Sequence, residues 1–525
     1  MPDAVHKEQW TDVHDSLVRS AQIGTERLPL RLPKVDHPLW SAVSRTGDIS
    51  DAARLLQGIS AWTHWVRAGA EPVDSHATWT VCADETSHIL SSKAAAILAD
   101  QIAGTNRQLI PEFLKAIGSH GFVVPVEILP ELLEIGELRP DVRKLVQQVI
   151  GVRGAWLAEA NADWSPMMSP PDPGLSSTGT KFDALPLAQR TIWLSHWREI
   201  HPGIALQFLS SRWSELAADE RKKFISMLRI GFSGEDAEFL NACRNDRSAE
   251  VRAEAASLGC LLPQSGWVTR MVERLRPLLQ ITPAKKQLLG LLRAKATLHV
   301  SLPEECDAGM QQDGVIEKVK DNDALTGRKA FWLQQMLNFV PPQIWATEAN
   351  TTPAEFIDLV VKDTFVEPVL RGIVHATLRH QDRVWALAIA THVADWLKPH
   401  TLVEICQLLE PAQSNTILVE RLQRSEEQRE AVLESLSTPW SEPICRWVHN
   451  HTLGPAYGFL ENHRERRIFA LYCVSAPVSL YQATVSACNA RESSDQHRML
   501  EMSRCLGLFR DRFEFLTSLE AAASR

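Results

Sequence analysis

A repeat with a fixed interval of 31 residues limits the possible folds of this chain more than any other feature. A basic residue marks the same position in three successive copies, namely Arg190, Arg221 and Arg252. The same step carries a large apolar residue through Leu209, Leu240 and Met271. Recurrence at a fixed period is the sequence signature of a repeat architecture, in which each unit packs on its neighbours.

Each copy has room for two helices, because residues that end helices lie near its middle. Gly203, Gly234 and Gly266 occur there, and Pro202 and Pro263 lie close by. Glycine and proline interrupt helices, so each repeat is predicted to be a helical hairpin. An amphipathic hairpin cannot bury its apolar stripe alone, and consecutive hairpins are therefore expected to stack around a continuous core.

The third copy begins with an acid, followed by Val-Arg and then Ala, in the stretch from Asp246 to Ala255. Asp246 is predicted to cap the helix that follows, and an Arg is predicted to meet an acid of a neighbouring repeat. Glu215 lies one repeat before Asp246. This ladder is expected to be peripheral, so that loss of Arg221 costs less stability than loss of Leu240. The stretch resembles the short bacterial form of the HEAT-repeat superfamily.

Composition narrows the class of protein. A chain of 525 residues exceeds one ordinary core, which predicts several domains or one long solenoid. A net charge of −9 argues against nucleic-acid binding by the whole surface, while leaving room for a local basic patch. The nine cysteines form no Cys-x-x-Cys pair, which indicates reduced thiols. With no apolar leader at Met1 to Trp10 and no apolar run of membrane length, we expect a cytoplasmic protein without a membrane partner.

The predicted fold class is all-α, with tandem helical hairpins in a HEAT-like α-solenoid and a helical N-terminal domain. The stretch from Ser165 to Lys181 is rich in Pro, Ser and Gly, which is typical of a linker. A further helix is predicted from Pro283 to Leu298. The expected domains are a helical N-terminal domain at 1–164, the linker at 165–181, HEAT-like repeats at 182–300, an irregular connection at 301–328 and C-terminal helical hairpins at 329–525.

Several apparent catalytic or ligand-binding motifs fail on spacing. The stretch from Gly174 to Lys181 nearly spells a P-loop, but Thr180 stands where Lys should follow the second Gly, and a proline run precedes it in place of a strand. His392 and Asp395 share a helix face without any strong metal-ligand spacing around them. Asp321 begins a stretch that lacks the Gly and Glu of a calcium loop. No catalytic residue, cofactor or metal ligand is predicted.

One local feature points to a partner. Residues 265–295 carry seven basic residues and one acid, which is a strong local excess in an acidic chain. Arg270 and Arg274 are one helical turn apart and are predicted to lie on the second helix of a hairpin. We predict a docking site for an acidic partner at Arg270, Arg274, Lys285 and Lys286. An ordinary solvated helix face is the alternative interpretation.

A second resemblance covers most of the chain. Four stretches carry it: Ile23-Gly24-Thr25-Glu26-Arg27-Leu28-Pro29, Arg153 to Ala158 with Asn161 and Trp164, Gly327 to Leu333, and Asp382 to Ala386. They resemble landmarks of an uncharacterised bacterial family that is similar to HEAT-repeat proteins. That family is typically encoded beside a MoxR-type AAA+ ATPase and a von Willebrand factor A domain protein, sometimes with a SWIM zinc-finger protein. The resemblance implies an accessory subunit with these proteins as partners, and no catalytic residues can be carried over from it.

Two classes of function follow from these observations. The preferred one is a non-catalytic scaffold or adaptor, whose curved helical-repeat surface binds protein partners. The alternative is an enzyme built on HEAT-like repeats, either glycosylase-like and acting on DNA bases or similar to a bilin lyase. The acidic net charge weakens the DNA version, whereas the basic stretch at residues 265–295 keeps it open.

Overall fold

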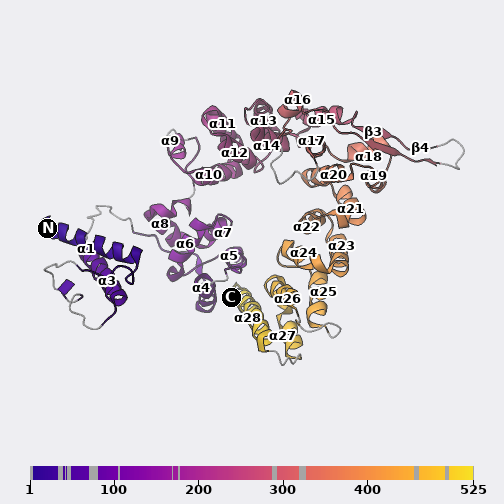
Figure 1. Ribbon diagram of the computed structural model, residues 1–525. Coiled ribbons are helices and arrows are strands. Elements are labelled where there is room, and N and C mark those ends of the chain that lie inside the picture. Colours follow the sequence, from indigo (N-terminus) through magenta and orange to yellow (C-terminus); the bar gives the residue numbers. More distant parts are fainter. Residues whose placement is uncertain are drawn as a thin grey trace. The chain divides into compact units, whose positions relative to one another are not determined.

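The computed structural model describes residues 4–32, 40–41, 43, 49–69, 81–104, 107–167, 170–174, 178–286, 293–318, 327–454, 460, 462–490 and 496–523. Helices dominate these residues and the strands are short, so the predicted all-α class is confirmed (Figure 1). The chain forms two compact units, Met1–Val81 and Cys82–Arg525. The sequence predicts the first boundary at residue 164, whereas the structure divides the chain after Val81.

The first unit contains helices α1 (Ala4–Ile23) and α3 (Asp51–Gly69), which pack against each other. Val13 and Leu17 of α1 are buried together with Trp40. The carboxylate of Asp51 accepts a hydrogen bond from the backbone N–H of Leu30 at 3.1 Å. These contacts give the unit a small core of its own.

The second unit begins with a helical segment that also carries one short pair of parallel strands. Its elements are β1 (His88–Ile89), α4 (Ser92–Ala103), α5 (Ile110–Ser119), β2 (Phe122–Val123), α6 (Leu129–Leu138), α7 (Arg143–Val149), α8 (Gly151–Ala160), the 3-10 helix η2 (Ala162–Met167) and α9 (Thr178–Asp183).

The predicted linker at 165–181 is therefore partly helical, because η2 and α9 both enter it. The chain between them also packs on the first hairpin, where the indole N–H of Trp197 donates to the carbonyl of Pro171 at 2.9 Å. Both segments belong to one compact unit.

The three predicted hairpins are present. They are α10 (Leu187–Ile200) with α11 (Pro202–Arg212), α12 (Ala218–Met227) with α13 (Ala237–Cys243), and α14 (Ala249–Gly259) with α15 (Trp267–Leu275). The first helices form a row in which α10 packs on α12 and α12 on α14. The repeated apolar residues Leu209, Leu240 and Met271 are all buried in one continuous core. The 31-residue step thus corresponds to one stacked hairpin.

Replacing Leu240 by alanine is expected to lower the free energy of unfolding by about 2 to 4 kcal/mol, because the side chain is completely buried and leaves a cavity. Denaturant melts of the full chain measure this loss. Val384→Ala is a matched control, since Val384 lies on a helix but is largely exposed. An equal shift of the melting midpoint in both variants would contradict a core position for Leu240.

The start of α14 differs from the prediction in one detail. Ser248, not Asp246, is the N-cap, because its side chain accepts from the backbone N–H of Val251. Asp246 instead accepts from the N–H of Ser248 at 2.8 Å and forms an ion pair with Arg221 at 2.8 Å. The expected contact between an Arg and an acid of a neighbouring repeat is confirmed for this pair. One repeat earlier, Arg190 pairs with Glu220 and not with Glu215.

The expected peripheral position of this ladder is wrong. The side chains of Arg221 and Asp246 are only 4% and 7% exposed. A second guanidinium N–H of Arg221 donates to the carbonyl of Leu216, and the indole of Trp213 lies 5.9 Å from the guanidinium carbon. The pair is therefore a buried junction between two hairpins.

The helix predicted from Pro283 to Leu298 is also wrong. The chain forms a two-stranded ribbon, in which β3 (Leu279–Thr282) pairs antiparallel with β6 (Thr297–Val300), and β4 (Lys285–Lys286) with β5 (Arg293–Ala294). Leu279 and Val300 face each other in the core, while Gln280 and His299 are exposed. This alternation is the period of a half-buried strand, and it replaces the helical period expected from the apolar run.

The remaining elements are helical, as the sequence predicts for residues 329–525, whereas α16 (Ala308–Gln312) lies in the stretch at 301–328 that is predicted to be irregular. They are α16 (Ala308–Gln312), α17 (Arg328–Leu337), α18 (Gln343–Ala349), α19 (Pro353–Val360), α20 (Val366–His380), α21 (Arg383–His392), α22 (Pro399–Gln407), α23 (Pro411–Arg424), α24 (Arg429–Ser435), α25 (Glu442–Leu453), α26 (His463–Ser475), α27 (Tyr481–Asn489) and α28 (Gln496–Ala523). Two rows of contacts run through them, from α20 to α22, α24 and α26, and from α19 to α21.

The last helix of the second unit returns to its first helices. Helix α28 packs on α26 and also on α4 and α5. The guanidinium of Arg512, which is 1% exposed, donates two hydrogen bonds of 2.6 Å to the carboxylate of Glu112. The rings of Phe113 and Phe515 stack at 3.9 Å. This closing contact joins residues at opposite ends of the unit.

Among the described residues, no single helix has both the length and the apolar character needed to cross a bilayer. One sharply bent pair, His463–Ser475 with Val478–Asn489, meets the criterion by length and composition only.

Candidate functional site: an arginine cluster around Asp313

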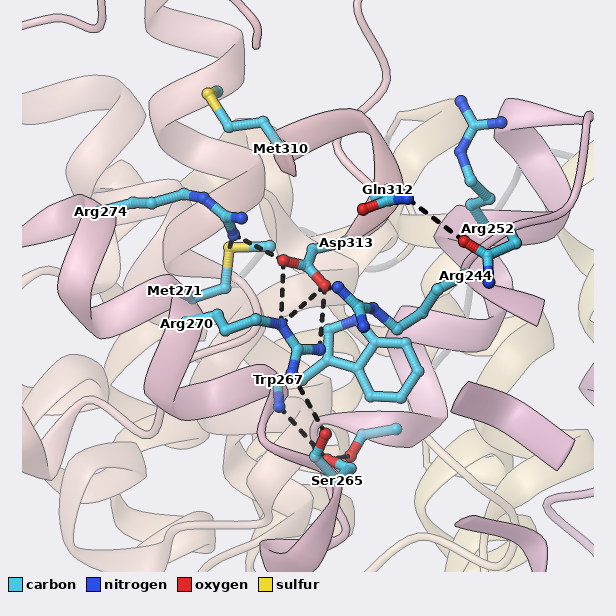
Figure 2. A network of polar contacts seen from close by, with 12 residues as sticks. Arg244, Arg252, Ser265, Trp267, Arg270, Met271, Arg274, Met310, Gln312 and Asp313 are labelled. Carbon is cyan, nitrogen blue, oxygen red and sulfur yellow. Dashed lines mark hydrogen bonds and ion pairs between the residues drawn. The ribbon is translucent and has the colours of Figure 1, made fainter. Parts of the chain in front are cut away.

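After the ribbon, the chain returns to the third hairpin (α14 and α15), which it contacts through Asp313 (Figure 2). The short helix α16 starts at the N-cap Asp307, whose carboxylate accepts from the N–H of Met310, and it ends at Asp313. The side chain of Asp313 is completely buried. A buried carboxylate needs compensating donors, and here they come from residues 39 to 69 positions away in sequence.

Three arginines supply these donors and form, with Asp313, what we call the arginine cluster. Arg244, which follows α13, donates from Nε at 2.8 Å. Arg270 of α15 donates from Nε at 2.9 and 3.0 Å, and Arg274, one turn later, donates from Nη1 at 2.7 Å. Their side chains are 24 to 27% exposed. The arginines thus reach from the surface to one buried anion.

The indole ring of Trp267 packs against two arginines of the cluster. Trp267 is completely buried, and the guanidinium carbons of Arg270 and Arg244 lie 5.4 and 5.9 Å from its ring. A guanidinium over an aromatic face is attracted by the ring quadrupole, which orients both arginines. Gly259 makes room for this indole, because a Cβ there would lie 2.3 Å from the ring.

The electrostatics keep Asp313 ionised. Burial alone would raise its pKa, but hydrogen bonds from Arg270 and Arg274 and the positive charges of Arg270 and Arg244 outweigh burial and hold the pKa below the usual value for aspartate. One carboxylate balances one of the three guanidinium charges. The cluster therefore presents an excess of positive charge at a partly exposed position, where planar guanidinium groups suit a second carboxylate or another oxyanion.

A second set of contacts ties the cluster to the ladder. Arg252 donates to the backbone carbonyls of Gln311 and Asp246, both at 2.7 Å. The side chain of Gln312 donates to that of Asn245 at 3.2 Å. Because Asp246 also binds Arg221, the buried junction between hairpins and the arginine cluster form one connected polar network.

The four residues predicted to bind a partner lie on two different elements. Arg270 and Arg274 are in the cluster on the second helix of the third hairpin, as predicted, whereas Lys285 and Lys286 lie on strand β4 of the ribbon. Their role in docking stays a prediction. Sequence reasoning missed Arg244 and Asp313. No local pattern marks Asp313, because its partners come from other elements.

The structure places two residues of the rejected motifs. His392 lies 3.9 Å from Asp358, and Asp395 pairs with Arg421. The described residues contain no group of three or more His, Cys, Asp or Glu side chains that could hold a metal ion. The stretch Asp321 to Asp323 lies outside the described residues.

The buried thiols are also poor nucleophiles. Burial raises the pKa of Cys243, Cys406, Cys445 and Cys488 to about 12. A thiol with such a pKa is protonated at neutral pH, whereas the thiolate is the reactive form. These four cysteines are therefore structural.

Comparison with known protein families places the chain in one of them. A family model aligns with residues 16–519, which is nearly the whole chain. The chain belongs to the DUF5691 family. That family is described as one of unknown function, and the match includes the arginine cluster and the ribbon. No curated protein and no solved structure matches the chain.

Proposed function

We propose that this DUF5691 protein is a non-catalytic scaffold or adaptor that binds protein partners in the bacterial cytoplasm. The observation that carries the proposal is the arginine cluster, in which three partly exposed guanidinium groups are held by one buried carboxylate. Acidic side chains of a partner are the expected ligands. As partners we propose a MoxR-type AAA+ ATPase and a von Willebrand factor A domain protein, which are typically encoded beside the family that this chain resembles.

Preorganisation is the physical reason that such a cluster suits recognition. A free arginine loses rotamer entropy when a partner fixes it, which costs about 0.5 to 1.5 kcal/mol for each side chain. Asp313 and Trp267 already fix Arg244 and Arg270 in the unbound chain. A partner carboxylate would therefore meet donors whose geometry is set before binding. Stacked helical hairpins supply the rigid frame that such a surface requires.

The test is co-purification of the tagged full chain from its native host, with identification of the bound proteins by mass spectrometry. Direct pull-downs with the two proposed partners follow. The critical variant is Arg244→Gln with Arg274→Gln, which removes two positive charges and leaves Arg270 paired with Asp313. We expect partner recovery to fall roughly tenfold, equivalent to about 1.4 kcal/mol of binding free energy.

The matched control is Arg247→Gln with Arg276→Gln, because these arginines belong to the same hairpin but do not bind Asp313. It should retain partner recovery. Equal recovery by both double variants would reject the cluster as the docking surface. If the wild-type chain recovers no protein, the scaffold proposal fails, and a salt-dependent shift of duplex DNA would then favour the enzyme acting on DNA bases.

A further inference from the structure

Among the described residues, the ribbon is anchored at its base by contacts with the neighbouring helices, and farther out β4 pairs with β5. At the base, the N–H of Ala284 donates to the carbonyl of Ala349 at 3.0 Å, and the N–H of Val300 donates to the carboxylate of Asp363 at 3.1 Å. Among the described residues, β4 and β5 belong to a sheet of two strands. Figure 1 shows β3 and β4 running away from the helices beside them.

The charge of the ribbon is entirely positive. Residues 279–300 contain Lys285, Lys286, Arg293 and Lys295, and they contain no Asp or Glu. The register places Lys286 directly opposite Arg293. Two like charges opposite each other destabilise an antiparallel pair, and a ribbon of two strands has little stability to spare. An anionic partner would lower the repulsion expected from this register.

We infer that the ribbon is a docking arm that binds an extended acidic segment of a protein partner. Beyond the base, β4 and β5 have no third strand among the described residues, so an added strand can pair at their outer edges. Carboxylates on that strand complement the positive charge of residues 279–300. This inference rests on the proposed scaffold function and assigns to it a second contact with a defined ligand chemistry, separate from the arginine cluster.

The experiment uses the full chain and a fluorescein-labelled peptide of five Glu-Thr repeats, with binding followed by fluorescence anisotropy. The main variant carries Lys285→Glu, Lys286→Glu, Arg293→Glu and Lys295→Glu. It keeps a like-charged pair at the same register position, so that repulsion within the ribbon is matched. We expect its affinity for the peptide to fall at least tenfold, and wild-type binding to weaken as salt shortens the Debye length from about 10 Å at 0.1 M to about 3 Å at 1 M.

Two further measurements separate recognition from ribbon stability. Arg293→Glu alone places a favourable opposite-charge pair across the ribbon but lowers its positive charge. Weaker peptide binding by this variant supports charge recognition, whereas tighter binding shows that ribbon order sets affinity and overturns the inference. A peptide of five Lys-Thr repeats should bind the fourfold variant better than it binds the wild type, since the charges are then exchanged.

The control variant reverses four exposed lysines elsewhere in the second unit, namely Lys115, Lys223, Lys362 and Lys398. Equal loss of peptide binding in this control would show non-specific attraction and reject the arm.

Lysines on strand edges also discourage pairing between copies of a chain. If the fourfold ribbon variant self-associates and still binds the peptide, the ribbon lysines serve to prevent pairing between copies, and the docking inference is overturned. Wild-type binding to a DNA duplex in place of the peptide would also overturn the inference.

Failure of the arm and failure of the scaffold are distinguishable. If the fourfold variant loses the peptide but still recovers its partners from the native host, docking occurs elsewhere, so the arm is rejected and the scaffold is retained. If the wild type binds the peptide but recovers no protein, the scaffold is rejected. Loss of both the peptide and the partners in a variant with a wild-type melting temperature supports the arm.

Discussion

Replacing Arg221 by alanine is expected to lower the free energy of unfolding by about 3 to 5 kcal/mol, because it leaves the buried carboxylate of Asp246 without its guanidinium partner. The loss should equal or exceed that of Leu240→Ala, which reverses the ranking expected from the sequence. Denaturant melts of the two single variants, compared in one buffer, measure this order.

A double-mutant cycle provides the control for Arg221. The variant Asp246→Ala alone leaves Arg221 buried without its anion, whereas the double variant removes both charges. The double variant should therefore cost clearly less than the sum of the two single changes. A strictly additive result would mean that the two side chains do not interact, in contradiction to their 2.8 Å ion pair.

Replacing Asp313 by alanine is expected to cost about 3 kcal/mol, because three neighbouring guanidinium groups lose the carboxylate that holds them together. Adding Arg244→Gln and Arg274→Gln to this variant should recover part of the loss by removing their mutual repulsion. Chemical denaturation of the three proteins is the measurement. If the added substitutions destabilise the chain further, the arginines have stabilising contacts other than Asp313.

The contribution of Asp313 should depend on pH in a defined direction. Its pKa is lower in the folded chain than the value of about 3.9 typical of an unfolded aspartate. The stabilisation is therefore present above the unfolded pKa and is lost as pH falls through the folded pKa. The difference between wild type and Asp313→Ala should stay constant from neutral pH to about pH 5 and shrink only in stronger acid. A difference that already vanishes near pH 6 would contradict this account.

The stacked hairpins could be predicted because a periodic signal specifies them. Each 31-residue step carries its own helix breakers and buried apolar positions, so local information is repeated three times. The position of Arg270 and Arg274 on a second helix followed from the same register. An all-α fold therefore needed no knowledge of long-range contacts.

The burial of charged residues could not be predicted from that pattern. Arg221 occupies a helix that is polar in sequence, and packing against Asp246 of the next repeat contributes to its burial. Asp313 lies in a stretch that looks like an irregular loop, and its three partners lie on other elements. Contacts across tens of residues leave no periodic trace in a single sequence.

The ribbon was missed for a related reason. The apolar run between its strands fits a helix as well as a strand when judged by period alone. The alternation of Leu279, Gln280 and Ile281 is too short to decide the matter. The pairing with Thr297 to Val300 supplies the missing information, and it is a tertiary contact.

The closing contact between α28 and the helices α4 and α5 has a consequence for synthesis of the chain on the ribosome. Phe515 and Leu519 complete the core around α4 and α5, and Arg512 lies 400 residues after its partner Glu112. At roughly 5 to 20 residues per second, the early helices wait about 20 to 80 s for their last packing partner. During that interval Phe113 and its apolar neighbours lack their final cover, so we expect the early helices to be prone to aggregation until α28 emerges.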